Sequence, residues 1–242
     1  MSAEKRAGRQ TADGPHRLLF DPACGEPSAE WFDPAFWAQS AEVKAADGGR
    51  GSAWFIHHDD GHWVLRQFRR GGRIAALSKD RYLYTGLERT RAFREWRLLH
   101  WLQARSLPAP TPVAACVVLH GLTYQAQLIT VAIPDSHTLA RLLADGAITG
   151  ALMRDVGRCV ARFHREGIWH ADLNAHNVLI DGEQKVYLID FDRGEQRDGD
   201  GWQRGNVDRF ERSLHKLSRQ AGRDGFEPDL WTAFVEGYRA PN

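Results

Sequence analysis

The sequence has few cysteines and no long apolar run. The first argues against a disulfide-stabilised secreted protein, and the second against a membrane-spanning one. Cys24, Cys116 and Cys159 lack the spacing of metal ligands and leave at least one thiol unpaired, which favours a reducing compartment over a disulfide-stabilised secreted fold. No stretch approaches the roughly 20 apolar residues of a membrane span. Residues 1–17 are polar and lack the apolar core of a signal peptide. We therefore expect a protein that is cytosolic or attached to a membrane only from outside.

An excess of one charge is also missing. The 32 Lys and Arg residues nearly balance 31 Asp and Glu residues, for a formal net charge of +1, so no general attraction to nucleic acid is expected. With 242 residues and 43% hydrophobic content, the chain can bury the core of one two-lobed unit or of a larger single domain. Nine tryptophans are many for this length, and they indicate either core packing or a surface at a lipid headgroup layer.

Two short apolar runs lie between residues 168 and 193. Val178–Ile180 and Val186–Ile189 flank Asp181-Gly182, and this pattern predicts a β-hairpin with a tight turn. The hairpin matters because polar residues border it on both sides.

Asp172 and Asn177 precede the hairpin, and Asp190 follows its second run directly. Phosphoryl transfer from ATP needs one carboxylate to accept the proton of the attacking hydroxyl. It also needs an amide oxygen and a second carboxylate to hold magnesium ions on the phosphates. Asp and Asn are common in ordinary turns as well. Three spaced matches around two strands are more specific than any single motif.

This stretch resembles the catalytic and metal-binding loops of the protein-kinase superfamily, H-x-D-L-x-x-x-x-N followed by a strand and D-F-G. The resemblance implies that Asp172 is the base and that Asn177 and Asp190 are the metal ligands. Ala171 stands where most protein kinases have arginine, and Asp192 replaces the glycine of D-F-G. The first difference points toward the small-molecule and lipid kinases of the superfamily.

A glycine-rich turn precedes a second predicted hairpin, Ala53–His57 and His62–Phe68. In a kinase N-lobe such a turn covers the ATP phosphates, because backbone N–H groups approach closely where no Cβ intervenes. Gly49, Gly51 and Ser52 are the candidates for this contact. The alternative is that they are simply turn residues.

A cation lies on the second strand of this hairpin. Strand alternation places Arg66 on one face with Val64 and Phe68, and an unpaired cation between apolar neighbours would be costly to bury. By position Arg66 resembles the lysine of the third kinase strand. Because it is an arginine, Lys79 remains the alternative residue for reaching the ATP phosphates.

The helix predicted over Thr90–Arg105 places Glu95 on its apolar face, with leucines three, four and seven residues later. Glu95 is therefore the candidate partner of Arg66, as in the ion pair between the third strand and helix C of kinases. The alternative is a surface pair with Arg91 or Arg94.

The expected architecture is an α+β, bilobal protein-kinase-like fold with a disordered tail over residues 1–16. The N-lobe, residues 17–133, is an antiparallel sheet with one helix, and the C-lobe, residues 134–242, is small and mainly helical. Residues 33–37 and 41–44 are expected to form a short helix and a turn. Two further strands are predicted over Val113–Leu119 and Tyr124–Val131. C-lobe helices are predicted over Thr138–Ala144, Ala151–Glu166, Val207–Gln220 and Asp229–Tyr238. His164 is expected to be a core or capping histidine.

The segments GGRGSAWF, WVLRQFRRGG, LPAPTPVAA, IWHADLNAHNVLID and YLIDFDRG together resemble the bacterial 3-deoxy-D-manno-octulosonic acid (Kdo) kinase family over about residues 30 to 240. The resemblance implies ATP and Mg²⁺ as cofactors and phosphorylation of the 4-OH of the Kdo residue of Kdo–lipid A. It places this step of lipopolysaccharide inner-core synthesis at the cytoplasmic side of the bacterial inner membrane, with the enzyme bound peripherally. No protein partner is implied.

A basic segment gives an independent argument for an anionic glycolipid acceptor and an anionic membrane surface. Its members are Arg66, Arg69, Arg70, Arg73, Lys79 and Arg81, with Tyr82 and Tyr84 interleaved. The alternative is a solvated strand end and loop.

Other functions remain to be distinguished. One is a kinase-like phosphotransferase that acts on a core heptose or an aminoglycoside. An aminoglycoside is polycationic, so the basic segment argues against it. Another is a pseudokinase scaffold that binds nucleotide without catalysis. Such scaffolds usually lack a base or a metal ligand, and here all three residues are present.

Overall fold

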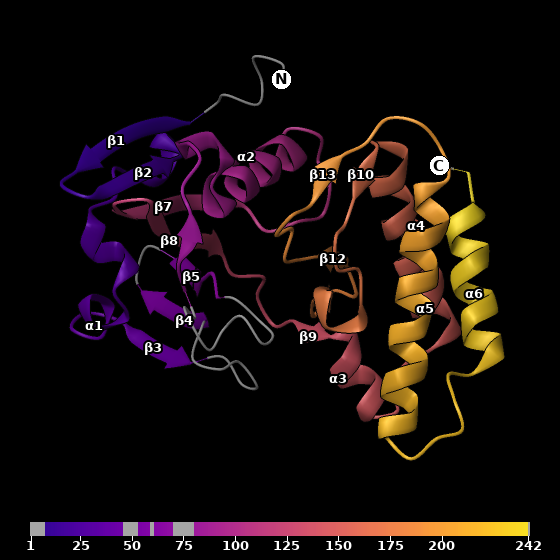
Figure 1. Ribbon diagram of the computed structural model, residues 1–242. Helices are drawn as coiled ribbons and strands as arrows, with labels where there is room; N and C mark the ends of the chain where they lie inside the picture. Colours follow the sequence, from indigo (N-terminus) through magenta and orange to yellow (C-terminus); the bar gives the residue numbers. More distant parts are fainter. Residues whose placement is uncertain (1–7, 46–52, 59–60, 70–79, 242) are drawn as a thin grey trace. The chain divides into compact units, whose positions relative to one another are not determined.

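The computed structural model describes residues 8–45, 53–58, 61–69 and 80–241, and the chain divides into two compact units (Figure 1). Unit 1 comprises Met1–Trp101 and Pro110–Ala132, and unit 2 comprises Leu102–Ala109 and Ile133–Asn242. Residues 102–109, predicted in the first lobe, instead belong to unit 2. Pro108 O accepts a hydrogen bond from Leu188 N at 3.0 Å, and Ser106 O accepts one from Arg162 at 2.8 Å.

Unit 1 is built on an antiparallel sheet, as predicted. Within the described residues it has eight strands in the order β1-β2-β7-β8-β5-β4-β3, with β6 paired to β8. Their bounds are β1 (Arg9–Asp13), β2 (His16–Phe20), β3 (Glu42–Ala45), β4 (Ala53–His58), β5 (Gly61–Gln67), β6 (Tyr82–Leu83), β7 (Pro112–His120) and β8 (Thr123–Val131). The predicted hairpin β4–β5 is present, and the two further predicted strands, β7 and β8, pair with each other.

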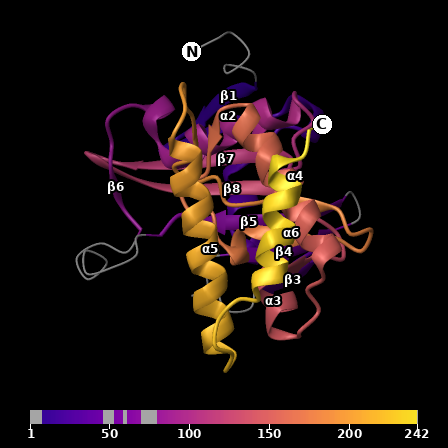
Figure 2. The same cartoon turned by 90° about the vertical axis from the view of Figure 1, so that its right-hand side faces the viewer.

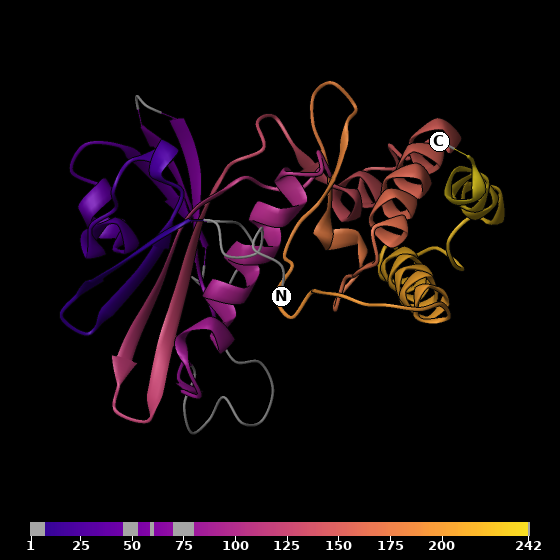
Figure 3. The ribbon, with the colours of Figure 1, turned by 90° about the horizontal axis from the view of Figure 1, so that it is seen from above.

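The two faces of this sheet are covered by different elements (Figure 3). Helix α2 (Arg91–Gln103) lies on one face, and the segment with α1 (Pro34–Trp37) and the 3₁₀ turns Pro22–Cys24 and Ala29–Phe32 lies on the other. On the α1 face, Phe32 and Trp37 pack in one apolar cluster with Trp63 and Leu65 of β5. All nine tryptophans fall in the described residues and none is among the exposed apolar side chains. Four of them are buried and five are half-buried, so core packing accounts for the four buried ones.

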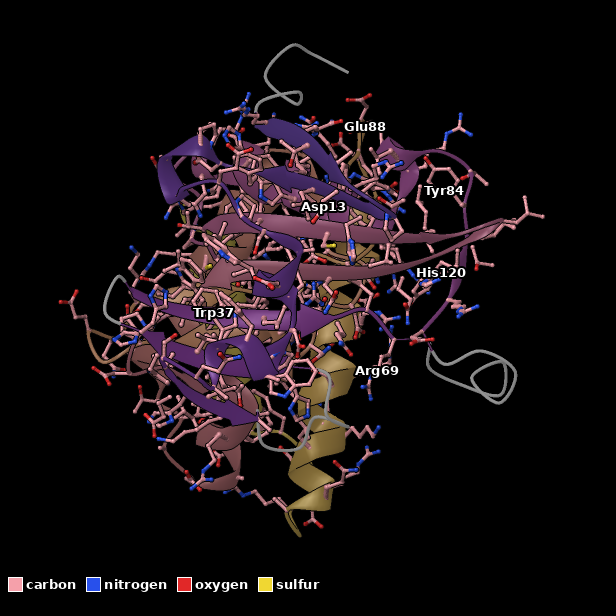
Figure 4. The ribbon with its side chains drawn as sticks, turned by 90° about the vertical axis from the view of Figure 1, so that its left-hand side faces the viewer. Asp13, Trp37, Arg69, Tyr84, Glu88 and His120 are labelled. Atoms are coloured by element: carbon pink, nitrogen blue, oxygen red, sulfur yellow. The ribbon has the colours of Figure 1, made fainter. Side chains whose placement is uncertain are left out.

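Two local predictions about unit 1 are wrong. Residues 9–16, expected in a disordered tail, form β1 and the start of β2, which pairs with β7. Glu88, at the β1 edge in Figure 4, accepts a hydrogen bond from Gln10 at 2.7 Å. The turn expected over residues 41–44 is largely strand, because Glu42–Ala45 form β3 along β4. In both cases pairing with an existing strand supplies hydrogen bonds that the local sequence does not reveal.

Unit 2 is mainly helical, and together with the sheet of unit 1 this confirms the α+β class (Figure 2). Its helices are α3 (Leu139–Ala144), α4 (Gly150–Arg165), α5 (Trp202–Gln220) and α6 (Pro228–Arg239). Helix α5 begins five residues before its predicted start at Val207. Short strands form two small sheets, β12-β11-β9 and β10-β13. These strands are β9 (His137–Thr138), β10 (Ile168–Trp169), β11 (Val178–Ile180), β12 (Val186–Leu188) and β13 (Glu195–Gln196).

Helices α4 and α6 approach each other through glycines. A methyl group at Gly157 would overlap the carbonyl oxygen of Phe234, and one at Gly237 would overlap that of Arg154. Backbone atoms cannot yield as a flexible side chain does, so the helices would have to separate.

We expect Gly157→Ala to lower the free energy of unfolding by about 1–3 kcal/mol, the usual cost of overpacking a core. Gly205→Ala is the matched control, because this α5 glycine has nothing within 4 Å of its missing Cβ. That variant should gain up to about 1 kcal/mol from helix propensity. Denaturant titration of both variants measures the difference, and equal stabilities would contradict the close packing.

Candidate functional site

The loop that carries Asp172 is fixed by a buried histidine. His170 is 2% exposed, its Nε2–H donates to the carbonyl of Ile189 at 2.9 Å, and its Nδ1 accepts from Asp172 N at 3.2 Å. This arrangement requires a neutral ring, and burial lowers the pKa of His170 accordingly. The imidazole thus ties the loop after β10 to the end of β12.

A second buried histidine extends this network into the helices. Asn206 of α5 donates to the carbonyl of His170 at 2.7 Å and accepts from His164 Nε2 at 3.1 Å. His164 Nδ1 lies 2.7 Å from the hydroxyl of Tyr238 on α6. Burial lowers the pKa of His164 to about 4. The prediction of a core histidine is confirmed.

The Asn177 side chain is held against the same loop. It is 9% exposed, and its Nδ2 donates to the carbonyl of Asp172 at 2.9 Å. This contact uses the amide nitrogen, so the amide oxygen is the atom that can coordinate a cation. Its backbone carbonyl accepts from Ile189 N at 3.0 Å, which brings the 3₁₀ turn Ala175–Asn177 beside the residue that precedes Asp190.

Asp190 adopts a left-handed backbone conformation with φ of 61°. Single Asp residues tolerate this region, and strained backbone is concentrated at functional sites. The next residue, Phe191, is 1% exposed and packs on His170 and Phe163, with ring centroids 4.9 and 5.5 Å away. The buried ring therefore anchors the segment that presents Asp190.

The oxygens of Asn177 and Asp190 fit Mg²⁺, which prefers hard oxygen ligands and usually takes one or two protein carboxylates together with phosphate oxygens. Among the described residues, no group of three or more His, Cys, Asp or Glu side chains is arranged to hold a metal. Two protein ligands completed by nucleotide phosphates need no such group.

The predicted hairpin between the two polar segments is confirmed, with Val178 opposite Leu188 and Ile180 opposite Val186. Its turn spans residues 181–185, between the two predicted runs. Asp181 Oδ1 accepts from the backbone N–H groups of Glu183 and Lys185 at 3.0 and 2.9 Å. The left-handed position falls on Gln184, with φ of 66°. The carboxylate of Asp181 thus organises the turn.

An arginine that the sequence pattern did not indicate lies against the candidate base. Arg209 of α5 donates to Asp172 Oδ1 at 2.6 Å, and the two side chains are 49% and 61% exposed. Helix α5 also supports the loop through Ser213, whose hydroxyl accepts from Ala175 N at 3.1 Å.

In unit 1, the predicted ion pair between Arg66 and Glu95 is present. Arg66 Nη2 lies 2.5 Å from Glu95 Oε2, and the side chains are 25% and 2% exposed. The guanidinium also lies over the Phe68 ring, 4.7 Å from its centroid. Because Trp63 and Leu65 occupy the α1 face of β5, strand alternation places Arg66 on the face covered by α2.

Several predicted residues lie outside the described part of the chain. These are the candidate phosphate-binding residues Gly49, Gly51 and Ser52, the alternative cation Lys79, and Arg70 and Arg73 of the basic segment.

Comparison with known proteins decides the family. The model of the lipopolysaccharide kinase (Kdo/WaaP) family matches residues 34–238. The chain belongs to this family. Three similar relatives each carry the name 3-deoxy-D-manno-octulosonic acid kinase. The Xylella fastidiosa (strain M23) protein is 44% identical over 82% of this chain and 80% of its own length. The Xanthomonas campestris pv. campestris (strain B100) protein is 44% identical over 88% and 85%, and the Vibrio cholerae serotype O1 protein 38% over 84% and 87%.

A solved structure is also similar to this family member. The Cydia pomonella granulovirus kinase PK-1 matches with a TM-score of 0.44 and 12% identity, over 70% of this chain and 58% of the viral chain.

Proposed function

We propose that this Kdo/WaaP family member is a 3-deoxy-D-manno-octulosonic acid kinase that transfers the γ-phosphoryl group of ATP to the 4-OH of the Kdo residue of Kdo–lipid A. The observation that carries the proposal is 44% identity, over 88% of the chain, to a relative named for this activity. The catalytic loop supports it, because His170 and Asn177 fix the backbone of Asp172 on both sides.

Each site residue has a proposed role in this reaction. Asp172 accepts the proton of the acceptor hydroxyl as its oxygen bonds to the γ-phosphorus and the bond from phosphorus to the ADP oxygen breaks. Asn177 and Asp190 hold Mg²⁺, which when bound neutralises charge on the phosphates. Arg66, oriented by Glu95, contacts a phosphate oxygen. A further proposed contact comes from the backbone of Gly49, Gly51 and Ser52.

The acceptor places the proposed reaction at the cytoplasmic side of the bacterial inner membrane. In the described residues, no helix is both long enough and apolar enough to span a bilayer. Arg69 and Arg81 of the basic segment are exposed, which supports peripheral attachment through anionic headgroups.

Incubation of the purified protein with ATP, Mg²⁺ and Kdo–lipid A tests the proposal. We expect a mass gain of one phosphate on the Kdo portion, located at the 4-OH by NMR of the released sugar. Parallel reactions with a heptose acceptor and an aminoglycoside test the rival substrates. Nucleotide binding without phosphate transfer to any acceptor would instead indicate a pseudokinase.

A further inference from the structure

The two most exposed large apolar side chains of the described residues lie together at one end of the unit 1 sheet. Leu122, in the turn between β7 and β8, is 80% exposed, and Leu83 of β6 is 65% exposed. Backbone pairing makes them neighbours in the sheet, since Leu83 pairs with Thr123, the residue after Leu122, and Tyr84 N donates to Leu122 O at 2.9 Å. In Figure 4 this turn extends past the other strands, on the side where Tyr84 and His120 lie. We call Leu83 and Leu122 the leucine tip.

Tyrosines on the two strands that carry the leucine tip contact the start of α2. Arg91, at the start of α2, donates to the Tyr82 hydroxyl and lies 4.8 Å from the centroid of that ring. The backbone N–H of Arg91 also donates to the Tyr124 hydroxyl at 3.1 Å, and the Tyr82 and Tyr124 rings are 5.5 Å apart. Tyrosine combines an apolar ring with a polar end, as side chains at a membrane interface do.

Two exposed cations adjoin strands that pair with β8. Arg81 immediately precedes β6, and Arg69 follows the end of β5. A specific protein complex buries about 800 Å² on each partner, far more than two leucines offer. A bilayer needs no complementary protein surface. Its anionic headgroups can bind the arginines, and its apolar interior can accept the leucines.

We propose that the leucine tip inserts at the boundary between headgroups and acyl chains of an anionic bilayer, while Arg69 and Arg81 contact the headgroups. This inference rests on the proposed function, because it places the enzyme on the membrane that carries its glycolipid acceptor. It adds a hydrophobic, salt-resistant component to the electrostatic attachment that the basic segment predicts.

Flotation of the full-length protein with phosphatidylcholine vesicles, with and without phosphatidylglycerol, at low and high salt tests this proposal. We expect wild type to float with the anionic vesicles and to keep a fraction bound at high salt. Leu83→Ser/Leu122→Ser should lose that fraction, with a partition coefficient at least about tenfold lower. Phe55→Ser removes another exposed apolar side chain, 38% exposed on β4, and should float like wild type.

Activity on detergent-solubilised acceptor separates the two proposals. The double serine variant should phosphorylate solubilised acceptor as wild type does and lose activity only on vesicle-borne acceptor. A wild type that phosphorylates neither the solubilised nor the vesicle-borne acceptor would overturn the proposed function and this inference with it. An active wild type that does not float, or a double variant that floats like wild type, would overturn the leucine tip alone.

The ion pair between Arg209 and Asp172 supports a second inference, which concerns how the acceptor is bound. The ion pair between Arg209 and Asp172 is exposed on both sides, so it contributes little to stability and can exchange partners at little cost. Arg212 and Lys216 follow Arg209 at spacings of three and seven on the exposed face of α5. A row of cations thus begins at the candidate base.

We infer that Arg209 binds the carboxylate of the acceptor sugar and releases Asp172 to accept the proton of the hydroxyl. This inference also rests on the proposed function, which supplies an acceptor with a carboxylate close to the reacting hydroxyl. Guanidinium suits this contact because it binds a carboxylate through two parallel hydrogen bonds.

Kinetics with an acceptor bearing a free carboxylate and with its methyl ester test the role of Arg209. We expect Arg209→Gln to raise the KM for the free acid at least about tenfold, to leave the KM for ATP unchanged, and to abolish discrimination against the ester. Arg209→Lys should restore part of the discrimination. Arg204→Gln, at another exposed position of α5 five residues before Arg209, is the control and should behave like wild type.

The outcomes distinguish this inference from the proposed function. No phosphorylation of the free acid by wild type would overturn both. An active wild type together with an Arg209→Gln variant that still discriminates against the ester would overturn only the role of Arg209.

Discussion

Asp190→Asn is expected to abolish turnover and to weaken magnesium-dependent nucleotide binding. The substitution keeps the size of the side chain and removes the charge that we propose to hold the metal. Asn tolerates the left-handed conformation as Asp does, so the φ of 61° at this position gives no reason for the loop to refold. Loss of several kcal/mol of metal-dependent stabilisation corresponds to a rate at least about 10³-fold lower.

Asp172→Asn is the matched comparison and is expected to act on a different step. The Asp172 backbone is held by His170 and Asn177, whereas its carboxylate is 61% exposed and contacts Arg209. The loop should therefore keep its structure. A general base contributes about 10²–10⁴-fold to rate, so turnover should fall by that factor while the Kd for ATP stays close to wild type.

Titration with ATP in the presence and absence of Mg²⁺, combined with single-turnover rates, measures both effects. Thermal melting of the two variants serves as the control for folding. An equal loss of nucleotide affinity in Asp172→Asn and Asp190→Asn would falsify the division of roles between base and metal ligand.

Local patterns predict most of the fold because they reflect local causes. The hairpin β11–β12 and the helices α2, α4 and α6 lie within two residues of their predicted bounds, since apolar periodicity and turn residues determine where such elements begin and end. β1 and β3 lack such a signal. They depend on backbone pairing with β2 and β4, and a polar edge strand resembles a loop in sequence.

Some residues of the candidate site can likewise be predicted from local sequence patterns, and others cannot. The spacing of Asp172, Asn177 and Asp190 is a local pattern and can be recognised in the sequence. Arg209 and Asn206 lie on α5, 37 and 36 positions from the loop residues that they contact. Contacts over such separations depend on the packing of α5, which no local motif encodes. The exposure of Leu83 and Leu122 likewise follows from the pairing of β6 with β8.

The last prediction concerns Arg66. Its guanidinium lies 2.5 Å from Glu95, which is nearly inaccessible to solvent, and it remains charged when desolvated. Its fork can hold this carboxylate and a phosphate oxygen at once. We therefore expect Arg66→Ala to raise the KM for ATP and to lower kcat together, with kcat/KM reduced by about 10²-fold, the equivalent of one strong charge-assisted contact. Glu95→Gln should have a smaller effect, because it loosens the clamp without removing the cation.

Stability must be measured beside the kinetics of Arg66→Ala, because removing one partner of a buried ion pair costs up to about 3–5 kcal/mol. The double variant Arg66→Ala/Glu95→Gln removes both charges and should recover much of that stability without recovering ATP use. Under the rival assignment, Lys79→Ala would cripple ATP use while Arg66→Ala mainly lowered the Tm. If a folded Arg66→Ala variant shows near-normal ATP kinetics, the residue that contacts the phosphate is Lys79. If the double variant is stable but uses ATP poorly, that residue is Arg66.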